Sequence, residues 1–275
     1  MNAENLYRQI LEKKSCLCIG LDTNLDLIPE FLRDKEYPLF EFNKEIIDAT
    51  HDLVIAYKPN LAFYERYGSG GWSQLEMTCR YIRERHQGIL LIADGKRGDI
   101  ANTSSMYADA VFEHLGCDAL TVSPYMGKDS VGPFYRDGKW LVVLALTSNE
   151  GSSDFQLLPV GQGDGLLYEH VLRRVSGWGN TDNTMFVVGA TKAEHLRRVR
   201  SIVPDHFLLV PGIGTQGGSL AEVMAGGLNR LGGLIINVSR KVLYAGHGPQ
   251  YAGSARSVAE AIRNECRTFL RDLPG

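Results

Sequence analysis

The sequence has no apolar run that approaches the roughly 18 residues of a membrane span. Residues 1–14 are polar and helix-like, without the apolar stretch of a secretion signal. We therefore expect a cytoplasmic protein with no membrane partner. Neither sign of charge dominates, since 29 Lys and Arg against 32 Asp and Glu leave a formal net charge of −3. A near-neutral chain gives no reason to expect nucleic acid as a partner.

Cysteine and histidine are few, and they lack the spacings that metal sites use. The five cysteines, at positions 16, 18, 79, 117 and 266, are scattered along the chain, and the seven histidines form no His-x-x-x-His pair. We therefore expect reduced thiols in or near the core, and no bound metal.

Three motifs of nucleophilic and nucleotide-binding enzymes are also missing. The chain contains no Gly-x-Ser-x-Gly nucleophile elbow, which disfavours hydrolase chemistry of that type. It contains no phosphate loop ending in Gly-Lys-Ser or Gly-Lys-Thr, and no dinucleotide-binding glycine fingerprint.

The sequence does contain a regular alternation of short apolar runs and amphipathic stretches. Eight runs predict strands over residues 17–21, 54–57, 89–93, 119–122, 141–146, 185–188, 207–210 and 234–238. Helical patterns cover residues 41–52, 74–86, 102–115, 166–175, 192–202, 219–225 and 254–273. Glycine-rich patches at 68–71 and 161–165 are interpreted as loop insertions. This order predicts one (β/α)8 barrel domain over residues 1–275, with a doubly wound open sheet as the alternative.

Charged residues gather after the second and third predicted strands, at the end where such a barrel carries its active site. Lys58 follows the second run, and Asp94, Lys96 and Asp99 follow the third in "ADGKRGD". Opposite charges at short range keep one another ionised even where water is excluded. A structural ion-pair network is the alternative. Because such pairs cost desolvation free energy, the cluster favours a functional site.

Residues suited to binding an anion follow the seventh and eighth predicted strands. "PGIGTQGG" (211–218) precedes a predicted helix, so its N–H groups and the helix N-terminus can hold an anion. Arg240 follows the next strand and can make two parallel hydrogen bonds to a phosphate. These two loops are the usual phosphate site of the barrel, although a glycine-rich loop alone would be weak evidence.

Four of these segments together resemble the orotidine 5'-monophosphate decarboxylase family. "DGKRGDI" has its Asp-x-Lys-x-x-Asp-Ile signature, and "IAYKPN", "PGIGTQGG" and "NVSR" fall where the family has its other motifs. The resemblance covers all eight predicted strands and points to the longer bacterial branch. Related sugar-phosphate decarboxylases share the Asp-x-Lys-x-x-Asp pattern but need Mg²⁺, and they have an acidic residue where this chain has Lys58.

The resemblance implies a cofactor-independent decarboxylation of orotidine 5'-monophosphate to UMP and CO₂, the last step of pyrimidine nucleotide synthesis. It implies that Lys96 protonates C6, that Asp94 lies against the substrate carboxylate and that Lys58 holds Asp94 by charge. Asp99, with Thr103 nearby, would reach into the site of a partner subunit in a homodimer. The implied substrate contacts are Asp22 for the ribose, Ser148 for the pyrimidine edge, and Gly212, Gly214, Gln216 and Arg240 for the 5'-phosphate.

Two alternative functions remain at this point. One is a Mg²⁺-dependent sugar-phosphate decarboxylase of the same suprafamily, and the other is a non-catalytic barrel that binds a nucleotide through its phosphate. The full set of charges after strands two and three disfavours mere binding, which needs no such costly cluster. Arg97 is the one charge of "DGKRGDI" with no implied catalytic role, so we expect it to be structural.

Overall fold

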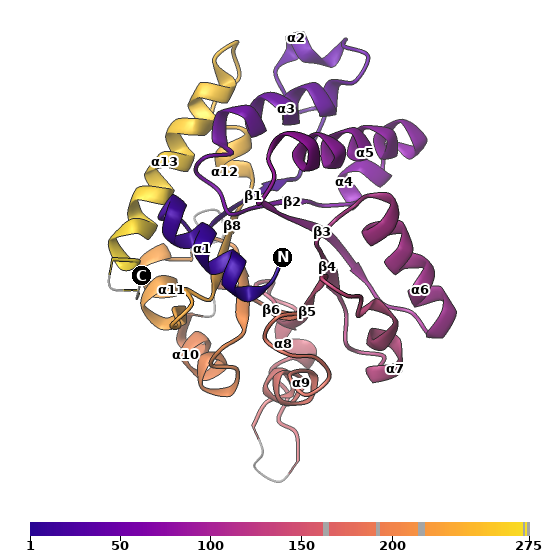
Figure 1. Cartoon of the computed structure of the whole chain (residues 1–275), viewed down its shortest axis with the longest axis vertical. Coiled ribbons are helices and arrows are strands. Elements are labelled where there is room, and N and C mark those ends of the chain that lie inside the picture. The colour runs from indigo at the N-terminus through magenta and orange to yellow at the C-terminus, as the bar shows by residue number, and fades with distance from the viewer. Residues whose placement is uncertain (162–164, 191–192, 214–217, 272, 274–275) are drawn as a thin grey trace.

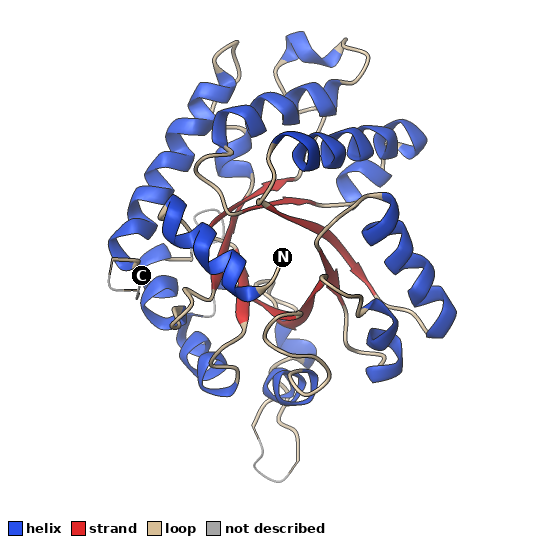
Figure 2. Cartoon of the chain, viewed as in Figure 1, coloured by secondary structure: helices blue, strands red, loops and turns tan. Residues whose placement is uncertain are grey.

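The strands of the computed structural model form a closed parallel barrel (Figures 1 and 2). The structure describes residues 1–161, 165–190, 193–213, 218–271 and 273. Within these residues, eight strands pair in chain order, and β8 pairs with β1. They are β1 (Leu17–Leu21), β2 (Ala56–Pro59), β3 (Leu90–Arg97), β4 (Ala119–Val122), β5 (Trp140–Leu146), β6 (Thr184–Val188), β7 (Phe207–Pro211) and β8 (Leu234–Val238). The predicted (β/α)8 barrel is confirmed.

Helices surround the barrel on its outer side (Figure 2). The longer ones are α1 (Ala3–Lys13), α3 (Pro38–Thr50), α5 (Gly68–Arg85), α6 (Ala101–Asp109), α9 (Leu167–Val175), α10 (Ala193–Ile202), α11 (Leu220–Gly227) and α13 (Tyr251–Phe269). Short helices are α2 (Glu30–Arg33), α4 (Ala62–Glu65), α7 (Lys128–Val131), α8 (Ser152–Phe155), α12 (Arg240–Leu243), the π-helical turn η1 (Ala110–His114) and the 3-10 turn η2 (Gly132–Phe134). No described helix is both long and apolar enough to cross a membrane.

The strands are buried on both faces, which explains their continuous apolar runs. β1, β4, β6 and β8 are buried along their whole length. One side of each strand faces the barrel interior and the other packs against the helices, so both sides are mainly apolar. The five cysteines are free and buried, as expected from their spacing.

The N-terminal segment covers the N-terminal end of the barrel (Figure 1). Leu6 and Ile10 of α1 are fully buried. The indole N–H of Trp140, at the start of β5, donates to the main-chain carbonyl of Met1 at 2.7 Å. This end is therefore occupied by the chain itself, and the opposite end carries the pocket described below.

The glycine-rich patch at 68–71 is a helix start, and its prediction as a loop was wrong. These residues form the first turn of α5. A Cβ atom on Gly71 would lie 2.1 Å from the carbonyl oxygen of Tyr64, a residue of α4. Glycine at this position allows α5 to approach the preceding helix closely, so it serves packing and not chain flexibility.

Candidate active site

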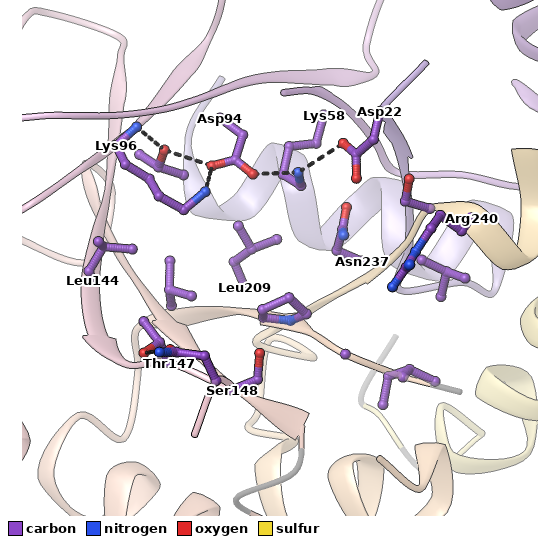
Figure 3. Close-up of a pocket in the computed structure, with 18 residues that line it drawn as sticks. Asp22, Lys58, Asp94, Lys96, Leu144, Thr147, Ser148, Leu209, Asn237 and Arg240 are labelled. Atoms are coloured by element: carbon purple, nitrogen blue, oxygen red, sulfur yellow. Dashed lines mark hydrogen bonds and ion pairs between the residues drawn. The ribbon is translucent and has the colours of Figure 1, made fainter. Parts of the chain in front are cut away.

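A pocket of about 410 Å³ opens at the C-terminal ends of the strands (Figure 3). Apolar side chains from three strands line part of it, including Leu144, Val187 and Leu209. Seven of the predicted site residues also line it: Asp22, Lys58, Asp94, Lys96, Ser148, Gly212 and Arg240. A concave site of this size that combines apolar walls with a few charged groups is typical of small-molecule binding.

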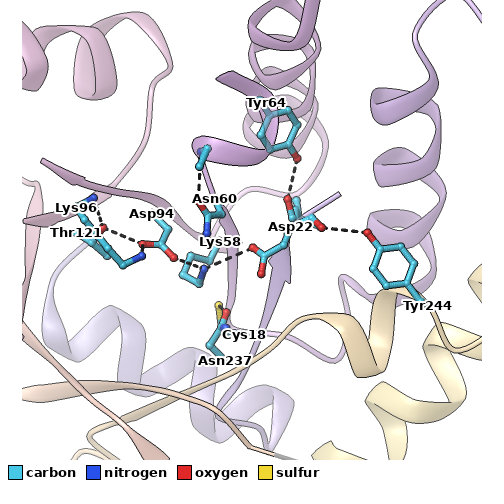
Figure 4. Close-up of polar contacts among 12 residues, drawn as sticks. Cys18, Asp22, Lys58, Asn60, Tyr64, Asp94, Lys96, Thr121, Asn237 and Tyr244 are labelled. Atoms are coloured by element: carbon cyan, nitrogen blue, oxygen red, sulfur yellow. Dashed lines mark hydrogen bonds and ion pairs between the residues drawn. The ribbon is translucent and has the colours of Figure 1, made fainter. Parts of the chain in front are cut away.

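Four charged side chains lie in a row of alternating sign along one side of the pocket: Asp22, Lys58, Asp94 and Lys96 (Figure 4). Lys58 Nζ is 2.7 Å from Asp94 Oδ2 and 3.8 Å from Asp22 Oδ1. Lys96 Nζ is 2.5 Å from Asp94 Oδ1. We refer to these four side chains as the charge row. It joins the ends of three neighbouring strands, β1, β2 and β3.

Lys58 and Asp94 keep each other charged. Burial alone lowers the pKa of Lys58, but the charges of Asp22 and Asp94 outweigh it and raise this pKa above its usual value. Burial also acts to raise the pKa of Asp94, but Lys58 and Lys96 bring it well below its usual range. Only 4% of the Lys58 side chain is exposed, compared with 50% of that of Lys96. Lys58 is therefore an internal charge, whereas Lys96 is open to a ligand.

Lys96 is positioned by an uncommon backbone conformation and by Thr121 on β4. Its φ angle is 46°, in the left-handed region that residues other than glycine seldom adopt. The register between β3 and β4 shifts between Ala93 and Arg97, as in a β-bulge. The Thr121 hydroxyl accepts the Lys96 N–H at 2.8 Å and donates to Asp94 Oδ1 at 3.1 Å. Thr121 thus couples the main chain of Lys96 to the carboxylate that its side chain contacts.

At the other end of the charge row, the main chain at Asp22 is held by two tyrosines. Tyr64 Oη donates to the carbonyl of Leu21, and Tyr244 Oη donates to that of Asp22, both at 3.0 Å (Figure 4). Within the described chain, Asp22 Oδ1 and Ser239 Oγ are buried without a hydrogen-bond partner. Because buried polar atoms are nearly always paired, these oxygens indicate a place for a polar group of a ligand.

The opposite side of the pocket is formed by Thr147, Ser148 and Asn149, which follow β5 (Figure 3). Gly212 lines the pocket after β7, and its φ of 98° requires glycine. Arg240, at the start of α12, is exposed at the rim. The predicted phosphate contacts Gly214 and Gln216 lie outside the described residues.

Asp99 and Thr103 do not line the pocket of their own chain. Asp99 Oδ1 accepts the N–H of Ile100 at 2.8 Å, just before α6, and Thr103 is exposed in the first turn of that helix. Of the charges in "DGKRGDI", Asp94 and Lys96 therefore line the pocket of their own chain, whereas Asp99 does not. The expected role of Asp99 in a partner's site stays a prediction.

Arg97 contacts two neighbouring elements at the same rim. It forms an ion pair with Glu65 of α4, and its guanidinium carbon lies 5.2 Å from the centroid of the Tyr107 ring on α6. These contacts tie the end of β3 to α4 and α6, in agreement with the structural role expected for Arg97.

Two polar residues of the pocket, Thr121 and Asn237, were given no role from the sequence. Asn237 Oδ1 accepts from Cys18 Sγ at 3.5 Å, and burial raises the pKa of that thiol to about 12, so the thiol remains a donor. Thr121 and Asn237 each interrupt an apolar run that forms a fully buried strand. A polar residue inside such a run was the available signal, because it must face a partner in the interior.

Comparison with known proteins agrees with this geometry. A family model described as "Orotidine 5'-phosphate decarboxylase / HUMPS family" matches residues 15–255. This chain belongs to that family. A Christiangramia forsetii relative named "Orotidine 5'-phosphate decarboxylase" is 52% identical over 274 residues, which is 99% of this chain and all of the relative. A Flavobacterium johnsoniae relative of the same name is 54% identical over 271 residues, 98% of each chain.

The family membership extends to the fold. The structure titled "Structure of Leishmania donovani OMP decarboxylase" superimposes with a TM-score of 0.81 at 39% identity, covering 98% of this chain and 99% of that chain. The similarity therefore includes every strand that contributes to the pocket.

The family description includes two groups of proteins, and the position of Lys58 bears on the difference between them. Its ammonium lies between the carboxylates of Asp22 and Asp94, where it repels a divalent cation. Among the described residues, no group of three or more His, Cys, Asp and Glu side chains is arranged to hold a metal ion. The charge row is thus built around an internal lysine, as in the predicted decarboxylase.

Proposed function

We propose that this protein converts orotidine 5'-monophosphate to UMP and CO₂ without a cofactor. The observation that carries the proposal is the charge row, in which two ammonium groups alternate with two carboxylates inside one pocket. Relatives of the same length that share about half of its residues are named for this reaction.

Lys96 is the residue that completes the reaction in this proposal. Breaking the bond between C6 and the carboxylate releases CO₂ and leaves the electron pair on C6, where no cofactor can accept it. The Lys96 ammonium, half exposed to the pocket, stabilises this charge and then donates its proton to C6. Solvent returns a proton to the amine, which completes the cycle.

Asp94 is placed to act against the carboxylate of the substrate. Lys58 and Lys96 hold its pKa low, so it keeps its negative charge when a ligand excludes water. A substrate carboxylate beside Asp94 is repelled, and the repulsion falls as that carboxylate leaves as neutral CO₂. The interaction thus favours the transition state over the bound substrate.

The remaining contacts hold the parts of the substrate that do not react. Asp22, whose Oδ1 has no hydrogen bond within the described chain, is the proposed ribose contact, and Ser148 is the proposed pyrimidine contact. Gly212 and Arg240 are proposed for the phosphate, together with the predicted Gly214 and Gln216. Binding free energy from the distant phosphate can then organise the site around the reacting carbon.

The test is a spectrophotometric assay with orotidine 5'-monophosphate, run with and without EDTA. We expect the same decarboxylation rate in both samples. Loss of the activity in EDTA, with recovery on adding Mg²⁺, would contradict the proposal and favour the sugar-phosphate decarboxylase. A protein that binds UMP but never turns over the substrate would favour the non-catalytic alternative.

We also propose a homodimer with shared active sites, each using Asp99 and Thr103 from the partner subunit. Four large apolar side chains are exposed in the segments that follow β3 and β4. They are Ile100 (57%) and Met106 (56%) after β3, and Tyr125 (84%) and Met126 (49%) after β4. Leaving these four side chains in water is costly, which supports their burial against a second copy. A single domain over 1–275 and a cytoplasmic location stay predictions from the sequence.

Subunit mixing tests the shared site. Asp22→Asn and Asp99→Asn are each expected to be inactive. A heterodimer of the two has one site with both residues intact, so mixing should restore part of the activity. No recovery after subunit exchange, verified by mass spectrometry, would contradict the sharing of sites while leaving the reaction itself untouched.

A further inference from the structure

The main chain of Thr147 leaves the barrel sheet at a point where its N–H needs a new partner. The pairing of β5 with β6 ends at Leu146 and Val188, and Gly189 N–H donates to the Leu146 carbonyl at 2.8 Å. The next N–H, that of Thr147, is accepted at 2.7 Å by Oε1 of Gln156. The C=O and N–H of a trans peptide point in opposite directions, so this N–H faces away from β6, and the side-chain amide of Gln156 supplies its acceptor.

The same amide also holds the Thr147 side chain. Because the main-chain N–H can only donate, Oε1 of Gln156 must face it, and Nε2 then donates to Thr147 Oγ1 at 2.9 Å. Thr147 Oγ1 lies 2.6 Å from Asn149 Oδ1 and 3.2 Å from Gln156 Oε1, so Asn149 is the better acceptor of the hydroxyl proton. The chain of hydrogen bonds runs from Gln156 through Thr147 to Asn149, on both sides of Ser148.

Gln156 is itself fixed at both of its main-chain groups. Its N–H donates to the Ser152 carbonyl of α8 at 2.9 Å, and its carbonyl accepts from Tyr168 N–H of α9 at 3.0 Å. From the other side, a Cβ atom on Gly189 would lie 2.7 Å from both N and Cα of Ser148. Residues 147–149 are thus enclosed between the end of β6 and Gln156.

We propose that Gln156 is a positioning residue for recognition of the pyrimidine base, a role that rests on the proposed function. Gln156 does not itself line the pocket, but it hydrogen-bonds to Thr147, which does. It holds residues 147–149, the side of the pocket across from the charge row, so that their polar groups meet the edge of the base (Figure 3). The segment after β5 therefore serves substrate specificity through a single amide.

The test compares two ligands, UMP and ribose 5-phosphate, which share the phosphoribosyl part and differ in the base. Dissociation constants are measured by calorimetry for the parent, Gln156→Ala and Gln156→Glu. The control is Ser153→Ala, which removes an exposed hydroxyl whose one hydrogen bond among the described residues is to the Glu150 carbonyl in the same segment. We expect Gln156→Ala to weaken UMP binding about tenfold and ribose 5-phosphate binding less than about twofold. Gln156→Glu keeps an acceptor for the Thr147 N–H, so we expect a smaller loss.

Each possible result either supports or overturns the proposed role of Gln156. Equal losses for both ligands in Gln156→Ala, or an unchanged ratio of the two dissociation constants, would overturn the inference while parent activity leaves the proposed function standing. If Gln156→Ala does not fold, the ratio of the dissociation constants for UMP and ribose 5-phosphate in Gln156→Glu is used in its place. An unchanged ratio there would likewise overturn the inference. A parent that fails to bind UMP would overturn the proposed function and this inference together.

Discussion

At the C-terminal end of the barrel, charged side chains contact one another along one side of a pocket, whereas at the N-terminal end partly buried cations are bonded to main-chain carbonyls. Lys58 lies between two carboxylates. Lys13 instead donates to the carbonyls of His51 and Val54, at 2.9 and 2.7 Å. Arg200 donates to five carbonyls: those of Val203, Pro204, His206, Gly227 and Gly233.

The pKa values of these cations show what the two arrangements can do. Burial lowers the pKa of Lys13 to about 8 and that of Arg200 to about 10. The pKa of Lys58 is raised despite deeper burial, because Asp22 and Asp94 carry full charges. Carbonyl dipoles satisfy donors and close the ends of helices, but they compensate a buried charge less than a carboxylate does. The contacts of cations with carbonyls at the N-terminal end stabilise the fold. The contacts with carboxylates at the C-terminal end hold charges ready for chemistry.

Removing the ammonium of Lys96 should cause the largest effect at the C-terminal end. We expect Lys96→Ala to lower turnover by at least about a thousandfold, because it removes the proton donor. UMP should still bind. Steady-state assays and calorimetry measure the two quantities, with Lys35→Ala at an exposed position as the control. Retention of a tenth of the parent turnover would exclude Lys96 as the donor.

Thr121→Val tests whether the uncommon backbone at Lys96 matters for catalysis. The change keeps the shape but removes the acceptor of the Lys96 N–H and the donor to Asp94. We expect kcat to fall on the order of tenfold to a hundredfold, with UMP affinity nearly unchanged. Thr121→Ser keeps the hydroxyl and should restore most of kcat. If serine is as impaired as valine, the loss comes from packing.

Arg200→Met tests the N-terminal end. It leaves several buried carbonyls without a donor, so we expect the free energy of unfolding to fall by about 3 kcal/mol. The kcat of the folded fraction should not change. Urea unfolding and an assay at low temperature measure the two effects, and Arg197→Met, an exposed change on the same helix, is the control. A fall in kcat without a loss of stability would contradict a purely structural role for this end.

The smallest expected effect is a pH dependence that belongs to the N-terminal end alone. Burial and the nearby Arg200 lower the pKa of His206, so the folded state binds fewer protons than the unfolded chain. Stability is therefore present above the ordinary histidine pKa and is lost as the pH falls below it.

Unfolding measured at about pH 7.5 and about pH 5.5 should differ by less than about 1 kcal/mol, and His206→Phe should reduce this difference. Asp94, with its lowered pKa, and Lys58, with its raised pKa, keep their charges over this range. An unchanged difference in His206→Phe would assign the pH dependence to another group, such as His86.

The sequence by itself determined the barrel and the centre of the site. Eight apolar runs with helices between them allow few other folds, and parallel strands bring their C-terminal ends to one rim. Lys58, Asp94 and Lys96 follow two adjacent runs, so their meeting could be predicted from order alone.

Only the tertiary structure decided the residues that hold those charges in place. Thr121 lies inside an apolar run, and the carboxylate it contacts is 27 positions away in the chain. Gln156 binds Thr147 across nine positions of a segment with no repeating pattern. Gly71 lets α5 pack closely against the Tyr64 carbonyl, a contact that exists only in the folded chain. Local periodicity records which face of an element is buried, whereas a hydrogen bond between distant residues exists only once the barrel has closed.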